Sequence, residues 1–365
     1  MKRVYIYGFG NIGRELITYI SGNKNLVISA VGDSKASLYS PSGFSISEID
    51  KIIGLKKGKG SLDGLHLDGI TQNEAMHHYW SDSGIFVDST GASSMGAILA
   101  RAIEGGAYVV TCNKLPLVSD DKSARTIISS ALDGRASIRG TVGADMGIPD
   151  ALIHELNSVH DISSIEIRCC PSGTLNYVCT AMQEGRKFSE AFNEAIDFGY
   201  TEPRPSMDAS GSDVLNKAII MARLVASHKK IDYSQISVRH TTFFHGIADE
   251  RFAKESIEYS RDDYKKITPS LDAPFSKRLS NLNGSVLRYV ASVVYDGRNI
   301  QVTTGLENVN SEDMLARLRG TENAFSIMVN DNALFFPAGK GGNSKGAGIG
   351  ETAHALYTGI ERFAG

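Results

Sequence analysis

The chain has 365 residues, of which 42% are hydrophobic and 22% charged, and its formal net charge is -3. A chain of this length can form two domains, and its nearly balanced charge excludes a strongly basic protein that binds nucleic acid along its surface. The longest basic run, Lys56-Lys57-Gly58-Lys59, is short and typical of a solvated loop.

No segment is typical of a membrane or secreted protein. The chain begins with a strand-like run, without the apolar core of a signal peptide, and no apolar stretch is long enough to cross a bilayer. The cysteines form no C-x-x-C pair and are expected as reduced thiols; they are Cys112, Cys169, Cys170 and Cys179. We therefore expect a soluble, cytoplasmic protein with no membrane or nucleic-acid partner.

The first third of the chain alternates short apolar runs with amphipathic segments. Strands are predicted over residues 3–7, 26–31, 85–89 and 107–111, with helices over 12–20 and 96–105. This order is typical of a parallel sheet with helices on both faces. The stretch 54–84 has weak periodicity and is expected as an insertion or a long loop.

The rest of the chain has a different character. Helices are predicted over residues 187–198, 213–226 and 346–363, and alternating strands over 285–295 and 299–304 with Asp296-Gly297 as a hairpin turn. We therefore predict an α/β protein with a Rossmann-like nucleotide-binding domain and a mixed α+β domain. The expected division is residues 1–142 with 345–365 for the first domain and 143–344 for the second.

A glycine motif, Gly8-Phe-Gly10-Asn-Ile-Gly13, lies between the first strand and the first helix. Gly8 permits the tight turn, Gly10 lets a pyrophosphate approach the backbone, and Gly13 allows close helix packing. The N–H groups of the helix N-terminus, where Asn11 and Ile12 lie, can hold the phosphates. The strand–helix–strand context favours a dinucleotide site over a simple glycine-rich turn.

The end of the second strand, Gly32-Asp33-Ser34-Lys35, gives conflicting signals about the cofactor. A carboxylate such as Asp33 usually binds the ribose hydroxyls of NAD. Ser34 and Lys35 can instead hold the 2′-phosphate of NADP, and Asp33 could turn aside. A plain polar turn is the remaining interpretation of Lys35. The sequence leaves the choice between NAD and NADP open, with NADP slightly favoured.

Three further segments place polar side chains where ligands commonly bind. A strand ends in Asn113-Lys114, at the edge where Rossmann-type sheets meet their ligands. A second segment precedes a helix whose N–H groups can hold a carboxylate; it reads Pro171-Ser-Gly173-Thr174-Leu-Asn176-Tyr177. The third carries spaced charges, as Tyr200-Thr-Glu202-Pro, Asp208 and Asp213-Val-Leu-Asn-Lys217.

In this order, the motifs resemble those of the homoserine dehydrogenase family. The resemblance covers nearly the whole chain, including Gly346-Ala-Gly348 and Thr352-Ala353 in the tail. It implies NAD(P)-dependent interconversion of L-homoserine and L-aspartate 4-semialdehyde, in the biosynthesis of threonine, methionine and isoleucine. It also implies that the strands within residues 285–304 build a sheet shared by two subunits, so we expect a homodimer.

The resemblance implies a role for each matching residue. Lys217 and Asp213 would act at the reacting hydroxyl, and Lys114 would be a second catalytic lysine facing substrate and nicotinamide. Glu202 would bind the substrate ammonium and Asp208 would support the site. The residues lying against the substrate would be Gly173, Thr174 and Tyr200. The cofactor would contact Gly8, Gly10, Asn11, Ile12, Gly13, Asp33, Ser34, Lys35, Ser89, Thr90, Lys114, Gly348 and Thr352.

The chemistry of these residue types agrees with such a substrate. Homoserine is a zwitterion with a distant hydroxyl, so its site needs an anion, donors for a carboxylate, and a proton carrier at the alcohol. Asp213 and Lys217 are four residues apart and lie on one face of a helix. Such a pair is commonly a surface ion pair, but its place directly after a proline-rich turn, within the pattern that the family resemblance implies, favours the functional interpretation.

The chain departs from the family between Arg139 and Pro149. Family members often carry a Glu before a loop that can hold a monovalent cation, and Arg139 stands in its place. We therefore expect no metal site there. Since the chain stops just after its last predicted helix, we expect neither a fused aspartate kinase nor an amino-acid-sensing domain.

Two other functions stay open at this level. One is a Rossmann dehydrogenase that acts on a different amino-acid alcohol or semialdehyde, against which the spacing from Glu202 to Lys217 argues. The other is a non-catalytic NAD(P)-sensing regulator, which would have no use for a proton-carrying lysine.

Overall fold

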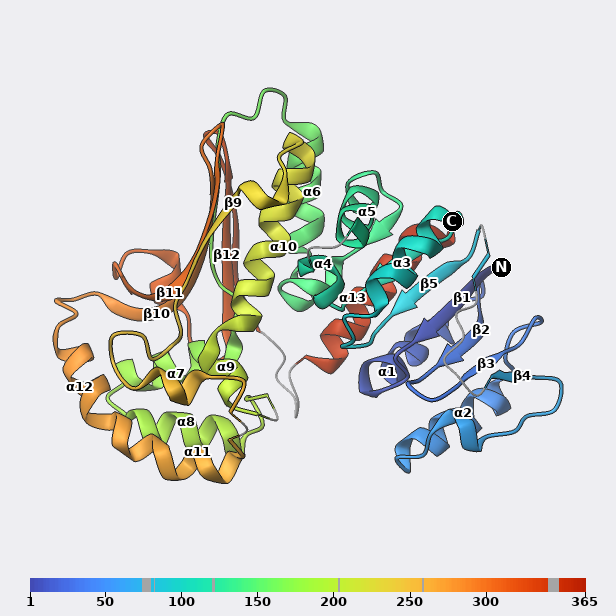
Figure 1. Ribbon diagram of the computed structural model, residues 1–365, viewed down its shortest axis with the longest axis horizontal. Helices are drawn as coiled ribbons and strands as arrows, with labels where there is room; N and C mark the ends of the chain where they lie inside the picture. Colours follow the sequence, from blue (N-terminus) through green and yellow to red (C-terminus); the bar gives the residue numbers. More distant parts are fainter. Residues whose placement is uncertain (74–79, 82, 120–121, 203, 258, 341–347) are drawn as a thin grey trace. The chain divides into compact units, whose positions relative to one another are not determined.

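The computed structural model describes residues 1–73, 80–81, 83–119, 122–202, 204–257, 259–340 and 348–365. The chain divides into two compact units (Figure 1). Unit 1 comprises Met1–Ile153 and Ile349–Gly365, and unit 2 comprises His154–Gly348. The boundary expected at residues 344–345 lies outside the described residues. The other boundary was expected after residue 142, whereas the two units divide between Ile153 and His154, inside α6 (Ile148–Ser158).

Unit 1 contains a sheet and the helices that cover it. Its strands are β1 (Lys2–Tyr7), β2 (Leu26–Gly32), β3 (Ser37–Tyr39), β4 (Thr71–Asn73), β5 (Ile85–Asp88), β6 (Tyr108–Thr111) and β7 (Ala136–Ser137). Its helices are α1 (Asn11–Ile20), α2 (Ile46–Lys57), α3 (Met95–Glu104), α4 (Leu115–Val118), α5 (Lys122–Leu132) and α13 (Ile349–Ala364), together with the start of α6. The strands and helices predicted for this part of the chain are therefore confirmed, with small differences at their ends.

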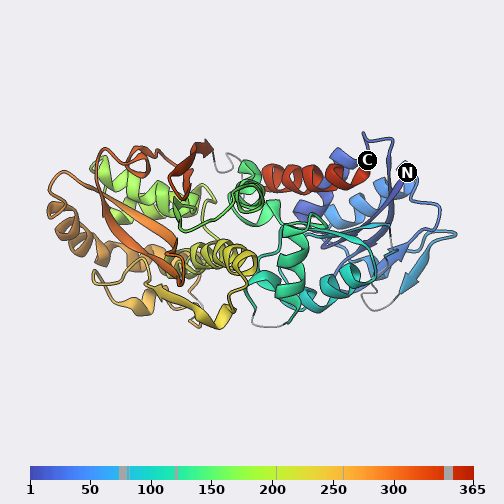
Figure 2. The same ribbon diagram turned by 90° about the horizontal axis from the view of Figure 1, so that it is seen from above.

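The described strands of unit 1 form one sheet in the order β4-β3-β2-β1-β5-β6-β7. The strands β2, β1, β5, β6 and β7 pair in parallel with their neighbours. At the other edge, β3 pairs antiparallel with β2, and β4 pairs antiparallel with β3. Figure 2 shows α13 alongside α1, and both bury apolar side chains in one core with β1. Helices α3 and α5 pack together and α3 contacts β5 and β6. Since consecutive strands run outward on both sides of β1, the carboxyl ends of β1 and β5 form the switch point where such sheets bind ligands.

The stretch 54–84 is not simply an insertion or a long loop. It begins with the last turn of α2 and contains β4, although residues 74–79 and 82 lie outside the described residues. Helix α2 begins at a capping box, in which Ser45 and Glu48 each bond the other's backbone N–H. Only Ile49 and Ile52 of α2 are buried, which explains why its apolar periodicity is weak.

Unit 2 is a mixed sheet with helices. Its strands are β8 (Ile165–Cys170), β9 (Ile236–His240), β10 (Val286–Tyr295), β11 (Ile300–Val309), β12 (Glu322–Val329) and β13 (Asn332–Lys340). Its helices are α7 (Gly173–Gln183), α8 (Phe188–Asp197), α9 (Ser206–Ser210), α10 (Ser212–Lys229), α11 (Arg261–Ile267) and α12 (Asp272–Ser280), with the end of α6. The predicted helices at 187–198 and 213–226 are thus confirmed.

The sheet of unit 2 has the strand order β13-β12-β8-β10-β11-β9 among the described residues. The predicted hairpin is confirmed, because β10 and β11 pair antiparallel from Tyr295 and Ile300 outward and Gly297 takes a φ of 92° in the turn. Helices α7 and α10 pack against β10. This arrangement fixes the N-terminal ends of α7 and α10, which carry the charged and glycine motifs of the sequence.

Candidate functional site

The glycine turn after β1 is shaped as a cradle. Gly8 has a φ of 93°, and a Cβ there would lie 2.5 Å from the main-chain carbon of Ser89. A Cβ on Gly13 would lie 2.6 Å from the main-chain oxygen of Gly8. A Cβ on Gly10, by contrast, would lie 3.9 Å from its nearest neighbour, the main-chain oxygen of Gly8, so the space beside the Gly10 backbone is open. The turn therefore fits a pyrophosphate at the N-terminus of α1.

The ends of β5 and β6 are joined by a buried polar network that the sequence analysis missed. Asp88 is fully buried, and burial raises the pKa of its carboxyl to about 6. The Asn113 amide donates to Asp88 Oδ2 at 3.2 Å, to Thr90 Oγ1 at 3.2 Å and to the Ala92 carbonyl at 2.9 Å. This network fixes the backbone at the end of β6, next to Lys114, the residue that precedes α4. A lone acidic residue at the end of an apolar strand was the available signal.

Asp33 is directed into its own turn. Its Oδ1 accepts hydrogen bonds from the backbone N–H groups of Lys35 at 2.9 Å and Ala36 at 3.1 Å. Its Oδ2 lies 2.7 Å from Lys56 Nζ and 3.0 Å from the backbone nitrogen of Leu62. Burial alone would raise the pKa of Asp33, but these hydrogen bonds lower it below its ordinary value. The side chains of Ser34 and Lys35 are exposed.

In unit 2, the turn that joins α9 to α10 gathers the predicted carboxylates. Asp208 Oδ2 accepts the Glu202 backbone N–H at 2.8 Å. Burial raises the pKa of Asp208 to about 7, and the negative charges of Glu202 and Asp213 add to the rise. The side chain of Glu202 is exposed. Three acidic side chains from separate positions in the sequence thus share one electrostatic environment.

The predicted lysine of α10 lies at the same place. Lys217 Nζ is 2.6 Å from Asp213 Oδ2, one turn earlier, and donates to the main-chain oxygen of Pro171 at 2.7 Å. Its side chain is only 15% exposed, so this is not an ordinary surface ion pair. The contact with Pro171 brings the segment before α7 to the charged turn, and no local pattern in the sequence indicates this contact.

The N-terminus of α7 completes this part of unit 2. Ser172 caps the helix by accepting the Leu175 N–H at 3.3 Å, and Thr174 Oγ1 donates to the Tyr200 carbonyl at 2.6 Å. The Thr174 hydroxyl also interacts with the carboxyl of Asp208. A Cβ on Gly173 would lie 3.1 Å from the Thr321 carbonyl oxygen, so a larger residue would crowd the turn. Gly173, Thr174 and Tyr200 are therefore linked to the carboxylate cluster.

The side chains of Ser210 and Glu255 stabilise the turn between α9 and α10. Ser210 Oγ donates to Glu255 Oε1 at 2.6 Å and accepts the N–H of Ser212, the first residue of α10, at 3.1 Å. Gly211 takes a φ of 74° between the two helices, where a Cβ would collide with the hydroxyl of Tyr289. The turn therefore requires glycine at position 211, and the hydrogen bond from Ser210 to Glu255 stabilises it. Sequence reasoning did not find Ser210 or Glu255.

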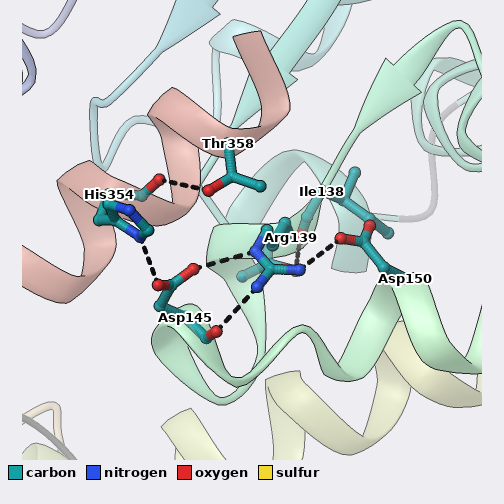
Figure 3. A network of polar contacts seen from close by, with 7 residues as sticks. Ile138, Arg139, Asp145, Asp150, His354 and Thr358 are labelled. Carbon is teal, nitrogen blue, oxygen red and sulfur yellow. Dashed lines mark hydrogen bonds and ion pairs between the residues drawn. The ribbon is translucent and has the colours of Figure 1, made fainter. Parts of the chain in front are cut away.

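The segment that departs from the family is organised around Arg139 (Figure 3). Its guanidinium lies 3.0 Å from Asp145 Oδ1 and 2.7 Å from Asp150 Oδ2, and it also donates to the Asp145 carbonyl at 2.9 Å. The other oxygen of Asp145 lies 2.5 Å from His354 Nδ1 on α13. Arg139 therefore supplies a positive charge among these acceptors. Within the described residues, no group of three or more His, Cys, Asp or Glu side chains is arranged to hold a metal ion.

The remaining predicted residues divide between the units. Lys114 and Thr352 belong to unit 1, as do the glycine turn and Asn11, Ile12, Ser89 and Thr90, while Gly348 ends unit 2 with a φ of 62°. Gly346 and Pro203 lie outside the described residues. All four cysteines are buried and free. No helix in the described ranges combines the length and apolar character needed to cross a membrane.

Comparison with known proteins gives two family matches. Residues 150–360 match the Homoserine dehydrogenase family, and residues 1–99 match the Glutamate/Leucine/Phenylalanine/Valine dehydrogenase family. The first match covers more than half of the chain and includes the charged turn, Lys217 and the N-terminus of α7. The second covers the glycine turn and Asp33.

Individual relatives agree with the first match. The chain is 29% identical over 360 residues to the Bifunctional aspartokinase/homoserine dehydrogenase 2 of Arabidopsis thaliana, which covers 94% of this chain but only 35% of that relative's length. It is 28% identical over 296 residues to the Homoserine dehydrogenase of Emericella nidulans, covering 76% of each chain.

The fold agrees as well. A hyperthermophilic archaeal homoserine dehydrogenase in complex with NADPH superposes with a TM-score of 0.65 at 19% identity, covering 99% of this chain and 97% of that one. With more than half of its length matched by the family profile, the chain belongs to the homoserine dehydrogenase family.

Proposed function

We propose that this protein is an NAD(P)-dependent oxidoreductase that interconverts L-homoserine and L-aspartate 4-semialdehyde. The observation that carries the proposal is the position of Lys217, whose ammonium is held between Asp213 and the Pro171 carbonyl beside Asp208 and Glu202. A zwitterionic substrate with a distant hydroxyl requires an anion for its ammonium and a proton carrier at its alcohol. Both are present within unit 2.

Each residue of the cluster has a proposed role. The exposed carboxylate of Glu202 binds the substrate ammonium, while Asp208 holds the Glu202 backbone and the Thr174 hydroxyl in place. As the neutral amine, Lys217 takes the hydroxyl proton during oxidation and becomes the ammonium, which returns that proton during reduction. Asp213 orients the amine. Gly173 and the N–H groups that begin α7 approach the substrate carboxylate, with Tyr200 beside them.

We propose unit 1 as the nucleotide-binding domain and unit 2 as the substrate-binding domain. The open backbone at Gly10 and the N–H groups of Asn11 and Ile12 hold the pyrophosphate, and Ser89 and Thr90 line the end of β5. A nicotinamide cofactor bound there would supply the hydride chemistry. Lys114, Gly348 and Thr352 are further proposed contacts, Lys114 also with substrate.

We propose NADP as the preferred cofactor. Asp33, which in an NAD enzyme accepts the ribose hydroxyls, already accepts hydrogen bonds from its own turn and from residues 56, 61 and 62. Ser34 and Lys35 remain exposed at the end of β2, where the 2′-phosphate lies in such folds. The archaeal relative was solved with NADPH.

We propose a cytoplasmic homodimer that associates through one face of the unit 2 sheet. Two cross-strand rows on that face are partly or fully exposed: Ser326, Arg168, Ser292 and Thr303, and Met328, Glu166, Val294 and Gln301. Val294 is 38% exposed and Phe335 on the edge strand is 63% exposed. Light scattering should give the mass of a dimer for the native protein and that of a monomer for Val294→Asp. A monomeric native protein would contradict the proposal.

The reaction is tested by following the absorbance of reduced nicotinamide with homoserine and either cofactor. A panel of other amino-acid alcohols addresses the rival dehydrogenase, and we expect homoserine to have the highest kcat/KM. A protein that binds NADPH but turns over none of these alcohols would support the non-catalytic regulator instead.

A further inference from the structure

The carboxylate of Asp33 has no acceptor capacity left for a ribose. A carboxylate offers about four lone-pair sites. Asp33 receives five donors, from the N–H groups of Lys35, Ala36 and Leu62, the ammonium of Lys56 and the hydroxyl of Ser61. The residue is only 7% exposed. Its role at the end of β2 is therefore to shape the turn, although its negative charge remains there.

Lys56 is the one cation in this set of donors. It comes from the last turn of α2, and its Nζ lies 2.7 Å from Asp33 Oδ2 with the two side chains 15% and 8% exposed. The backbone oxygen of Lys56 also accepts from Arg14 Nη1 at 3.4 Å, and Arg14 Nη2 donates to Asn11 Oδ1 at 2.7 Å. Lys56 and Arg14 thus add positive charge between the first turn of α1 and the end of β2.

The 2′-phosphate of NADP carries about 1.5 to 2 negative charges at neutral pH, whereas the 2′-hydroxyl of NAD carries none. An unpaired Asp33 carboxylate would repel the phosphate and leave NAD unaffected. We propose that Lys56 is a cofactor-specificity residue, which cancels the charge of Asp33 and so admits a 2′-phosphate to the end of β2. This inference deepens the proposed function and rests on its assignment of unit 1 as the nucleotide-binding domain.

The two backbone N–H groups on Oδ1 and the one from Leu62 on Oδ2 do not depend on Lys56. The turn should therefore keep its shape when Lys56 is replaced, and the main change is electrostatic. This separation makes a double-mutant cycle informative. Lys56→Met removes the positive charge, Asp33→Asn removes the negative one, and the double variant removes both.

The measurement is the dissociation constant of NADPH and of NADH, taken from the fluorescence of the reduced nicotinamide without any substrate. Lys56→Met should weaken NADPH binding by about tenfold or more and NADH binding by less than about threefold. If Lys56 acts by cancelling the charge of Asp33, adding Asp33→Asn to Lys56→Met should recover most of the lost NADPH affinity. Lys56→Arg should keep the native preference, and Lys57→Met, on the exposed neighbour, should change neither constant.

Several outcomes would overturn the inference. Equal weakening of NADPH and NADH by Lys56→Met, with a native thermal midpoint, would mean that Lys56 only supports the fold. Unchanged NADPH binding, or no recovery in the double variant, would show that Asp33 does not act on the phosphate. A native protein that binds neither cofactor would overturn the proposed function too, whereas loss of turnover with normal NADPH binding would affect only the proposed reaction.

Discussion

The side-chain ammonium of Lys217 donates a hydrogen bond to the main-chain oxygen of Pro171 at 2.7 Å. This contact joins the helix that carries the charged residues to the segment that begins α7. A lysine held by a carbonyl and by Asp213 has a fixed position, as a group that transfers a proton to one particular oxygen requires.

Replacing Lys217 tests the proton transfer directly. Lys217→Ala should lower kcat for homoserine oxidation by about a hundredfold or more, because general acid–base assistance is removed. The NADPH dissociation constant should not change, since the glycine turn lies in unit 1. Lys277→Ala, on an exposed position of α12, is the control, and near-native turnover in Lys217→Ala would assign the proton to Lys114 or to water.

Asp208 should make the stability of unit 2 depend on pH. Burial raises its pKa from 3.8 to about 7 in the folded protein, so the folded state binds a proton more tightly than the unfolded chain. This group therefore contributes a loss of stability that grows as pH rises from about 4 to about 7 and is constant above. Asp208→Asn cannot ionise, so its thermal midpoint should rise relative to the native protein between pH 5 and pH 8. Asp331→Asn, at an exposed position, is the control. If the thermal midpoints of Asp208→Asn and the native protein change in parallel with pH, the role assigned to Asp208 is contradicted.

Lys35 should contribute to the choice between the cofactors. Its side chain is exposed at the end of β2, so a 2′-phosphate gains an ion pair there that NAD cannot form. Lys35→Ala should lower kcat/KM for NADP by about tenfold and leave the value for NAD nearly unchanged. Lys24→Ala, exposed on the turn before β2, is the matched control. If the ratio of the two values stays native, Lys35 takes no part in recognition.

Arg139 should stabilise unit 1 through its two carboxylates. Arg139→Met leaves Asp145 and Asp150 without their shared cation, and we expect the free energy of unfolding to fall by about 1–3 kcal/mol. Asp145→Asn should cost less in the Arg139→Met background than in the native protein, because the pair is already broken. Urea unfolding of the two single variants and the double variant gives the coupling. Additive effects would mean that the guanidinium and Asp145 do not interact in solution.

Local sequence patterns predicted much of this molecule. The glycine turn was predictable because a positive φ at Gly8 and close packing at Gly13 can be met only by glycine. The pairing of Asp213 with Lys217 followed from helical periodicity, and the β10–β11 hairpin followed from Asp296-Gly297. Helix α2 was not predicted, because so few of its side chains are buried that its apolar periodicity is weak, although Ser45 and Glu48 have the spacing of a capping box.

The chemical state of the site residues depended on contacts between distant parts of the chain. Nothing near Asp33 in sequence indicated that Lys56 and Leu62 would occupy its carboxylate, which decides whether it can meet a ribose. The raised pKa of Asp208 comes from burial beneath neighbouring elements, and the anchor of Lys217 is a carbonyl that precedes α7. Periodicity and turn preferences act over a few residues, so a sequence can name the charged groups. The burial of these groups and their hydrogen-bond partners are decided only when helices and strands pack against one another. Burial and partners then determine which group carries a charge and which of its lone pairs can still bind a ligand.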